Sequence, residues 1–225
     1  MADRCLLYYI TDRSQFHGNE DTRRRALLAK IAEAVRAGVD YIQLREKDLS
    51  ARKLELLARE AVAVVRENQW PTGHGSVPTR LLMNSRTDVA LAAGAYGVHL
   101  RTDDLSAQEV CAVLQLSSQR PLTTDHFLVA ASCHAAADIL SAESEKVDFA
   151  VFAPVFGKRG SAGTAPVGLA ALREACKAKI PVLALGGVTM ENAALCLQAG
   201  AAGIAGIRLF QENKIEDVVR ALRAL

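Results

Sequence analysis

Short apolar segments alternate along the chain with longer segments in which apolar residues recur every three or four positions. The short segments, such as Tyr41–Leu44 and Gly97–Leu100, predict strands that are buried on both faces. The longer segments predict amphipathic helices; in 22–37, for example, the apolar spacing is helical, and Gly38 follows where a C-cap is expected. The other predicted strands are 6–11, 80–84, 126–132, 149–154, 182–185 and 203–207.

Strand and helix alternate eight times, with no change of composition that would mark a domain boundary. Such alternation predicts a parallel sheet, and eight units in 225 residues favour an α/β fold, a single (β/α)8 TIM barrel spanning 1–225. An open, doubly wound sheet is the alternative. That fold normally has a Gly-x-Gly-x-x-Gly turn after its first strand, and the sequence Thr11-Asp-Arg-Ser does not match it.

Composition narrows the range of partners. The net charge is +2 and no block of lysine or arginine occurs, so no nucleic-acid partner is expected. No apolar run approaches the ~20 residues that span a bilayer, so no membrane association is expected. The acidic start, Met1-Ala-Asp, differs from a signal peptide and favours a cytoplasmic protein. The oligomeric state stays open, although small barrels often form homodimers.

Polar residues gather where the predicted strands end, whereas the strand interiors are apolar. The active site of a TIM barrel lies at these carboxyl ends. Arg45 and Lys47 follow the second strand, and a planar guanidinium and an ammonium both bind phosphate oxygens strongly. We therefore expect a small phosphorylated ligand. His99 ends an apolar strand, which favours a buried structural histidine over a catalytic base.

Two glycines follow the seventh predicted strand. Gly186 and Gly187 have no β-carbon, so their amides can approach an anion closely, and a helix predicted to open near residue 190 would direct its positive end there. The loops after the last two strands of a TIM barrel form its usual phosphate site. A tight turn without a ligand is the alternative.

Several of these segments match a known family in order and over nearly the whole chain. These segments are 7–13, 43–48, 82–84 with Arg86 and 88–91, 97–100 with Asp104, 153–156 and 185–187. Through them the chain resembles thiamine-phosphate synthase and its relative, the thiazole tautomerase TenI. The synthase joins hydroxymethylpyrimidine diphosphate to thiazole phosphate and releases pyrophosphate with the help of magnesium.

The resemblance implies a role for each matching residue. Asp104 would be a magnesium ligand, and Ser132 would lie near the reacting centre. Gly187, with the main chain of Ile207 and Arg208, would hold the thiazole phosphate. The residues implied for the pyrimidine diphosphate are Gln43, Arg45, Lys47 and Asn84.

The chain also departs from the synthase pattern. Ser85 stands where synthases usually carry a second metal-binding Asp, which should weaken magnesium binding. The usual diphosphate loop is replaced by 157–161, where Lys158 or Arg159 would have to substitute from a different place. Arg101-Thr102 replaces a Gly-Gln pair, and Arg208 stands where Ser is frequent.

Three of these four changes fall on the diphosphate half, and the thiazole-phosphate half is kept. This favours a TenI-like isomerase, which relocates a proton on a thiazole carboxylate phosphate without a metal. His134 matches the position of its acid/base, and an imidazole titrates near neutral pH. Two alternatives stay open: a magnesium-dependent thiamine-phosphate synthase, which is a transferase, and a thiazole-phosphate binder without catalytic activity.

Overall fold

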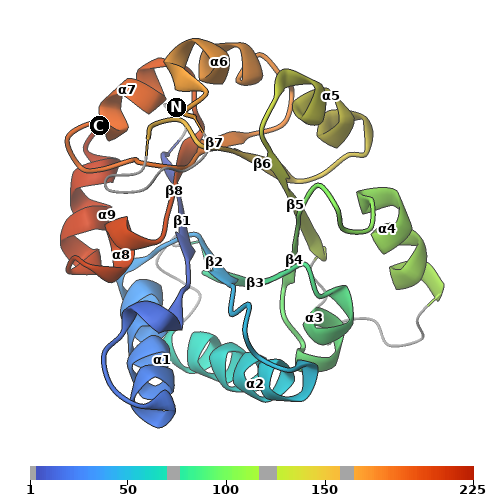
Figure 1. The fold of residues 1–225 in the computed structure, drawn as a ribbon, viewed down its shortest axis with the longest axis vertical. Coiled ribbons are helices and arrows are strands. Elements are labelled where there is room, and N and C mark those ends of the chain that lie inside the picture. The colour runs from blue at the N-terminus through green and yellow to red at the C-terminus, as the bar shows by residue number, and fades with distance from the viewer. Residues whose placement is uncertain (1–3, 70–76, 117–125, 158–164) are drawn as a thin grey trace.

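The computed structural model describes residues 4–69, 77–116, 126–157 and 165–225. Eight parallel strands form a closed barrel in the order β1 to β8, and the helices surround it (Figure 1). The last strand pairs with the first, with Leu6 opposite Gly203, so the sheet has no free edge. The predicted (β/α)8 barrel is confirmed.

The elements follow the predicted alternation closely. Within the described ranges, no helix has the length and apolar composition needed to cross a membrane. The strands are β1 Leu6–Ile10, β2 Tyr41–Leu44, β3 Arg80–Asn84, β4 Gly97–Leu100, β5 Leu128–Cys133, β6 Phe149–Phe152, β7 Val182–Ala184 and β8 Gly203–Gly206. The helices are η1 Arg13–Gln15, α1 Glu20–Ala37, α2 Ala51–Asn68, α3 Thr87–Ala93, α4 Ala107–Leu116, α5 Ala136–Ser144, α6 Gly168–Ala175, α7 Ala193–Gln198, α8 Arg208–Gln211 and α9 Ile215–Arg223.

Most predicted boundaries differ from the observed ones by one or two residues, and the starts of β5 and α7 show why. Strand β5 begins at Leu128 rather than at residue 126, because pairing with β4 starts where Leu128 lies opposite Gly97. Helix α7 begins at Ala193 rather than near residue 190. The side chain of Asn192 accepts a hydrogen bond from the Thr189 amide (2.8 Å) and donates one to the Gly187 carbonyl (3.0 Å), which holds the preceding residues in a turn.

Side chains fill the inside of the barrel. Tyr8 and Phe149 are buried there, in an edge-to-face contact with ring centroids 5.4 Å apart, and Tyr41 stacks on Phe149 at 4.7 Å. Leu82 and Leu183 lie in the same cluster. A second, larger apolar layer separates the strands from the helices. Because the interior is packed, a ligand can bind only at an end of the barrel.

At the amino ends of the strands, a buried carboxylate joins the two ends of the chain. Asp40, just before β2, accepts hydrogen bonds from the Leu7 amide (2.8 Å) and from the Arg223 guanidinium of α9 (3.0 Å). Arg4 also pairs with Asp40. This end of the molecule therefore contributes to closing the barrel.

Glycine is required where strands β4 and β8 begin. A β-carbon on Gly97 would lie 2.2 Å from the Leu128 carbonyl oxygen, and one on Gly203 would lie 2.1 Å from that of Leu6. Both obstacles are main-chain atoms of a neighbouring strand, so neither can move aside without opening the barrel.

We expect Gly203→Ala to lower the free energy of unfolding by about 3 kcal/mol, the upper range for overpacking. Gly38→Ala is the matched control, because a β-carbon there meets nothing within 4 Å and only the left-handed backbone (φ +81°) opposes it. That strain costs about 1 kcal/mol. Urea unfolding measures both variants, and equal losses would contradict the steric explanation.

Candidate functional site

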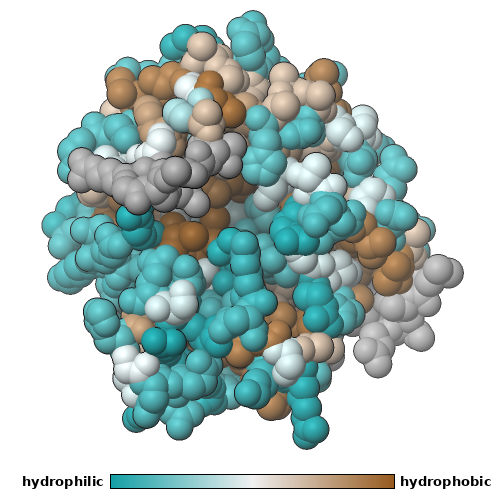
Figure 2. All heavy atoms as spheres, in the orientation of Figure 1, coloured by the Kyte–Doolittle hydropathy of each residue, from teal (hydrophilic) through white to brown (hydrophobic). Residues whose placement is uncertain are grey.

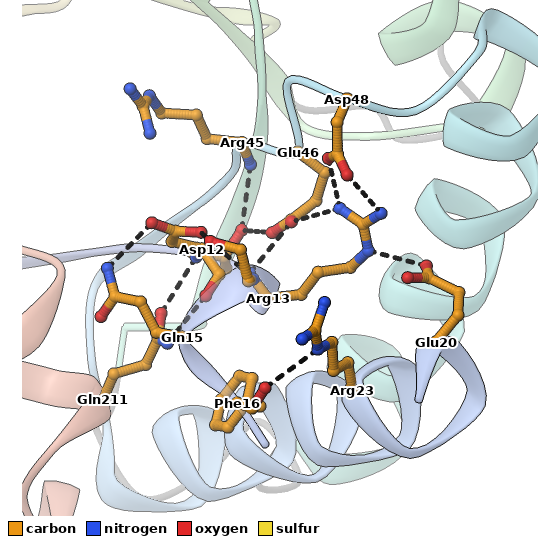
Figure 3. Close-up of polar contacts among 12 residues, drawn as sticks. Asp12, Arg13, Gln15, Phe16, Glu20, Arg23, Arg45, Glu46, Asp48 and Gln211 are labelled. Carbon is orange, nitrogen blue, oxygen red and sulfur yellow. Dashed lines mark hydrogen bonds and ion pairs between the residues drawn. The ribbon is translucent and has the colours of Figure 1, made fainter. Parts of the chain in front are cut away.

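A buried carboxylate organises the carboxyl ends of β1 and β2 (Figure 3). Glu46 accepts hydrogen bonds from the Thr11 hydroxyl (2.6 Å), the Arg13 amide (3.0 Å) and the Arg13 guanidinium (3.2 Å). Burial raises the pKa of Glu46, and these hydrogen bonds only partly offset that rise. The carboxylate therefore depends on Thr11 and Arg13 for its stability in the folded protein.

Arg13 extends this cluster to the loop after β2 and to α1. Its guanidinium forms a two-pronged pair with Asp48 (2.6 and 2.9 Å) and donates from Nε to Glu20 (2.8 Å). Hydrogen bonding by Arg13 lowers the pKa of Asp48. The Arg13 side chain is only 5% exposed, so the segments after β1 and β2 form one packed unit.

This unit directs Arg45 away from the acidic residues. The Arg45 amide donates to the Thr11 hydroxyl (3.0 Å), and the side chain extends away from the cluster (Figure 3). Its guanidinium is half-buried, and burial lowers its pKa. In the part of the chain that the structure describes, this side chain forms no hydrogen bond or ion pair. Glu46 and Asp48 bind Arg13 instead, and Lys47, two residues after Arg45, is exposed.

Four side chains form a row of hydrogen bonds across the barrel. The Gln43 amide nitrogen lies 3.1 Å from the Tyr8 hydroxyl, which lies 3.2 Å from Nδ1 of His99. Nε2 of His99 lies 2.8 Å from the Ser132 hydroxyl. Burial lowers the pKa of His99 to about 3, so the ring is neutral at physiological pH. The expected burial of His99 is thus confirmed.

The end of β3 has an unusual backbone at Ser85. Asn84 donates from its amide to the Ser85 hydroxyl (3.0 Å), and the Ser85 amide donates to the His99 carbonyl (2.9 Å). Ser85 has φ +64°, in the left-handed region, which Asn and Asp adopt more readily than other non-glycine residues. The position is therefore suited to the carboxylate that this chain lacks.

Asp104 is held by its own loop. It accepts a hydrogen bond from the Arg101 amide (2.7 Å), and the Arg101 guanidinium lies 3.6 Å from its other oxygen. With Ser85 in place of a second carboxylate, these residues fit a magnesium ion poorly. Among the described residues, no group of three or more His, Cys, Asp or Glu side chains is placed to hold a metal. A cavity of about 290 Å³ near Asp104 is lined mainly by residues of α4 and α5 and of the segments that precede them.

His134 is exposed just after β5. Its Nδ1 lies 2.7 Å from the Ala153 carbonyl oxygen, which can only accept, so Nδ1 carries the ring hydrogen in the neutral imidazole. The His134 amide donates to Asp138 (2.7 Å), which fixes the start of α5. Nε2 is then the nitrogen available to take a proton. Burial raises the pKa of the neighbouring Cys133 to about 12, so that thiol is not a nucleophile at neutral pH.

The two glycines after β7 adopt left-handed conformations, with φ +93° at Gly186 and +64° at Gly187. A β-carbon on Gly187 would lie 2.7 Å from the Gly157 carbonyl oxygen, and the Phe156 amide donates to the Gly186 carbonyl (2.9 Å). The glycines thus let the loops after β6 and β7 pack together. The predicted contribution of a helix near residue 190 is wrong, since α7 starts later.

The amide of Gly187 donates no hydrogen bond to any described residue. The same holds for the amides of Ile207 and Arg208, which join β8 directly to the short helix α8. Arg208 has an exposed side chain. Figure 2 shows this end of the barrel, with apolar atoms near its centre and hydrophilic side chains over α1 and α2. Lys158 lies outside the described residues.

The predicted site residues that the structure describes lie within the last residues of a strand or just after it, but two important groups were not predicted. Tyr8 lies inside a strand, where the sequence gives no sign of a polar contact 91 residues away. Arg13 falls in the segment 7–13 that carries the family resemblance, but no role of its own was predicted. Its pairing with Glu46 depends on how the two loops meet, which local patterns do not contain.

We expect Arg13→Met to lower the free energy of unfolding by about 3 kcal/mol, because it leaves Glu46 buried without its cation. Arg59→Met is the control. Arg59 pairs with Glu55 on the surface of α2, where the two side chains are 55% and 38% exposed. Loss of that pair should cost at most about 0.5 kcal/mol. Urea unfolding gives both free energies. If Arg13→Met lowers the free energy of unfolding no more than Arg59→Met does, the role assigned to this cluster is contradicted.

Comparisons with known proteins agree with this architecture. A family model described as thiamine monophosphate synthase matches residues 7–210. A putative thiamine-phosphate synthase of Geobacter sulfurreducens is 38% identical, over 97% of this chain and 93% of the relative. The thiamine-phosphate synthase of Methanoculleus marisnigri is 35% identical, over 96% and 93%.

A solved structure, thiamine phosphate pyrophosphorylase from Pyrococcus furiosus, matches with a TM-score of 0.75 and 25% identity. It covers 99% of this chain and 95% of that one. The chain therefore belongs to the thiamine-phosphate synthase/TenI family of thiamine-biosynthesis enzymes, which act on small phosphorylated substrates.

Proposed function

We propose that this protein binds a thiazole phosphate at the ends of β7 and β8 and acts on it as a TenI-like tautomerase, with His134 as the acid/base. The observation that carries the proposal is the contrast between two halves of the site. Asp104 is held by Arg101 and Ser85 replaces a carboxylate, whereas His134 presents one fixed imidazole nitrogen.

The phosphate would be held by main-chain amides. Those of Gly187, Ile207 and Arg208 have no acceptor among the described residues. The exposed Arg208 side chain adds a positive charge beside them. Amides and a guanidinium together recognise a phosphate without a metal.

Proton relocation requires one group that can accept a proton and return it elsewhere on the same ligand. With Nδ1–H of His134 donating to the Ala153 carbonyl, Nε2 takes the proton and the carbonyl stabilises the resulting imidazolium. The proton is then returned to another atom of the thiazole carboxylate phosphate, and the ring becomes aromatic with no change in composition. Arg45 would hold an anionic group of the ligand, since neither Glu46 nor Asp48 neutralises it.

We expect His134→Gln to lower kcat for this aromatisation by 100- to 10 000-fold, with roughly unchanged KM, because glutamine forms hydrogen bonds but does not transfer protons. The assay follows conversion of the thiazole carboxylate phosphate in the presence of a chelator. His126→Gln is the control, because His126 lies before β5, where it pairs with Asp148 (2.8 Å). If His134→Gln binds the ligand and turns over as wild type does, His134 has no catalytic role.

A second candidate is the synthase reaction, favoured by the names of the relatives. In this reading Gln43, Arg45, Lys47 and Asn84 hold the pyrimidine diphosphate, Lys158 contributes from its loop, and Asp104 binds magnesium. The positions of Gln43, Asn84 and Ser132 at the ends of β2, β3 and β5 are compatible with it. The poor fit of Ser85 and Asp104 to a metal places this reaction second.

We expect Ser85→Asp to raise magnesium-dependent synthase turnover at least tenfold, because it adds a carboxylate at the end of β3, which pairs with β4, the strand that precedes Asp104. Ser85→Asn is the matched control, since it tolerates the same left-handed backbone without adding charge. Product formation from hydroxymethylpyrimidine diphosphate and thiazole phosphate is measured as magnesium is varied. If wild type already saturates at micromolar magnesium, the synthase is the better assignment.

A further inference from the structure

In the row of side chains from Gln43 to Ser132, each residue donates its hydrogen bond to the next. We infer that Gln43 donates to Tyr8, Tyr8 to His99 and His99 to Ser132, so that Ser132 must point its own hydrogen at the ligand. Ser132 is then a hydrogen-bond donor and not a nucleophile, and Tyr8 and His99 are positioning residues that act through it. The identity of the ligand rests on the proposed function, but the direction of the row does not.

The direction begins at Gln43. Its amide nitrogen, which can only donate, lies 3.1 Å from the Tyr8 hydroxyl oxygen. Tyr8 is fully buried, with ring contacts to Tyr41 and Phe149. A buried hydroxyl hydrogen without an acceptor costs about 1–3 kcal/mol. Within the described residues, the acceptor left for this hydrogen is Nδ1 of His99, at 3.2 Å.

Tyr8 keeps its proton, because burial raises its pKa well above the usual range. His99 therefore receives a hydrogen bond at Nδ1, which must be the ring nitrogen without a hydrogen. Burial keeps the ring neutral, so its single hydrogen lies on Nε2. That hydrogen is donated to the Ser132 oxygen, 2.8 Å away.

Ser132 is the last member and the one that reaches open space. It is partly exposed, whereas Gln43, Tyr8 and His99 are buried. Its oxygen accepts from His99, so its hydrogen is free to bind an acceptor on the ligand, such as a phosphate or carboxylate oxygen. His99 cannot take this hydrogen, because the nitrogen that faces Ser132 already carries one. The arrangement thus differs from a serine–histidine pair in which the histidine is a base.

The tautomer of His99 tests this inference directly in the ligand-free protein. We expect ¹⁵N NMR of histidine-labelled wild type to show His99 protonated at Nε2 and unprotonated at Nδ1, with no change between pH 8 and pH 5. His99→Gln assigns the signals. His134 is an internal reference, because its contact with Ala153 requires the opposite tautomer. Protonation of His99 at Nδ1 in wild type would overturn the inference.

Tyr8→Phe removes the donor to Nδ1 and changes little else in the packing. We expect it to shift His99 measurably toward the Nδ1-protonated tautomer, a change that a merely structural role for Tyr8 would not cause. An unaltered tautomer in this variant would show that Tyr8 does not set the direction.

Binding of thiazole phosphate, measured by calorimetry, tests the link to Ser132. We expect Ser132→Ala to weaken binding about tenfold and Tyr8→Phe about threefold, with the double variant no weaker than Ser132→Ala alone, because Tyr8 acts through the Ser132 hydroxyl. Additive losses would contradict that link. If wild type binds no thiazole phosphate, the proposed function fails, while the NMR result still decides the direction of the row.

Discussion

The carboxylate of Glu46 is the group on which the arrangement of the site depends. Taking a carboxylate out of water is costly unless cations and hydrogen-bond donors surround it. Thr11 and Arg13 supply these from the end of β1, and Glu46 itself comes from the end of β2. The same hydroxyl that binds Glu46 also accepts from the Arg45 amide. The Thr11 hydroxyl, which helps to compensate the buried Glu46 charge, therefore also fixes the main chain at Arg45.

Two layers of polar contacts thus lie at this end of the barrel. The Glu46 cluster lies outside the strands and joins the loops, whereas the row from Gln43 to Ser132 lies within the ring of strands. Below them Phe149 and Leu183 fill the interior, so water has no route through the barrel. A ligand bound at this end of the barrel would lie on packed side chains that exclude water. Hydrogen bonds and charges act more strongly there than in water.

Much of the fold could be predicted from the sequence, because each strand and helix carries its own pattern of apolar residues. The site was predicted in part. Gly186 and Gly187 were recognisable as a glycine pair after a strand, but their packing against Phe156 and Gly157 was not. The start of α7 was not predictable either, because the side chain of Asn192 turns the chain first. The partners of Glu46 were also not predictable. Arg13, Arg45 and Lys47 are equally charged in the sequence, and only the packing of two loops selects Arg13.

The left-handed backbone at Ser85 also bears on how activities diverge on this barrel. The main chain at the end of β3 has a conformation that asparagine and aspartate adopt with less strain than serine. A carboxylate at this position can thus be gained or lost by exchange of one side chain, with the strand and the following helix α3 left in place.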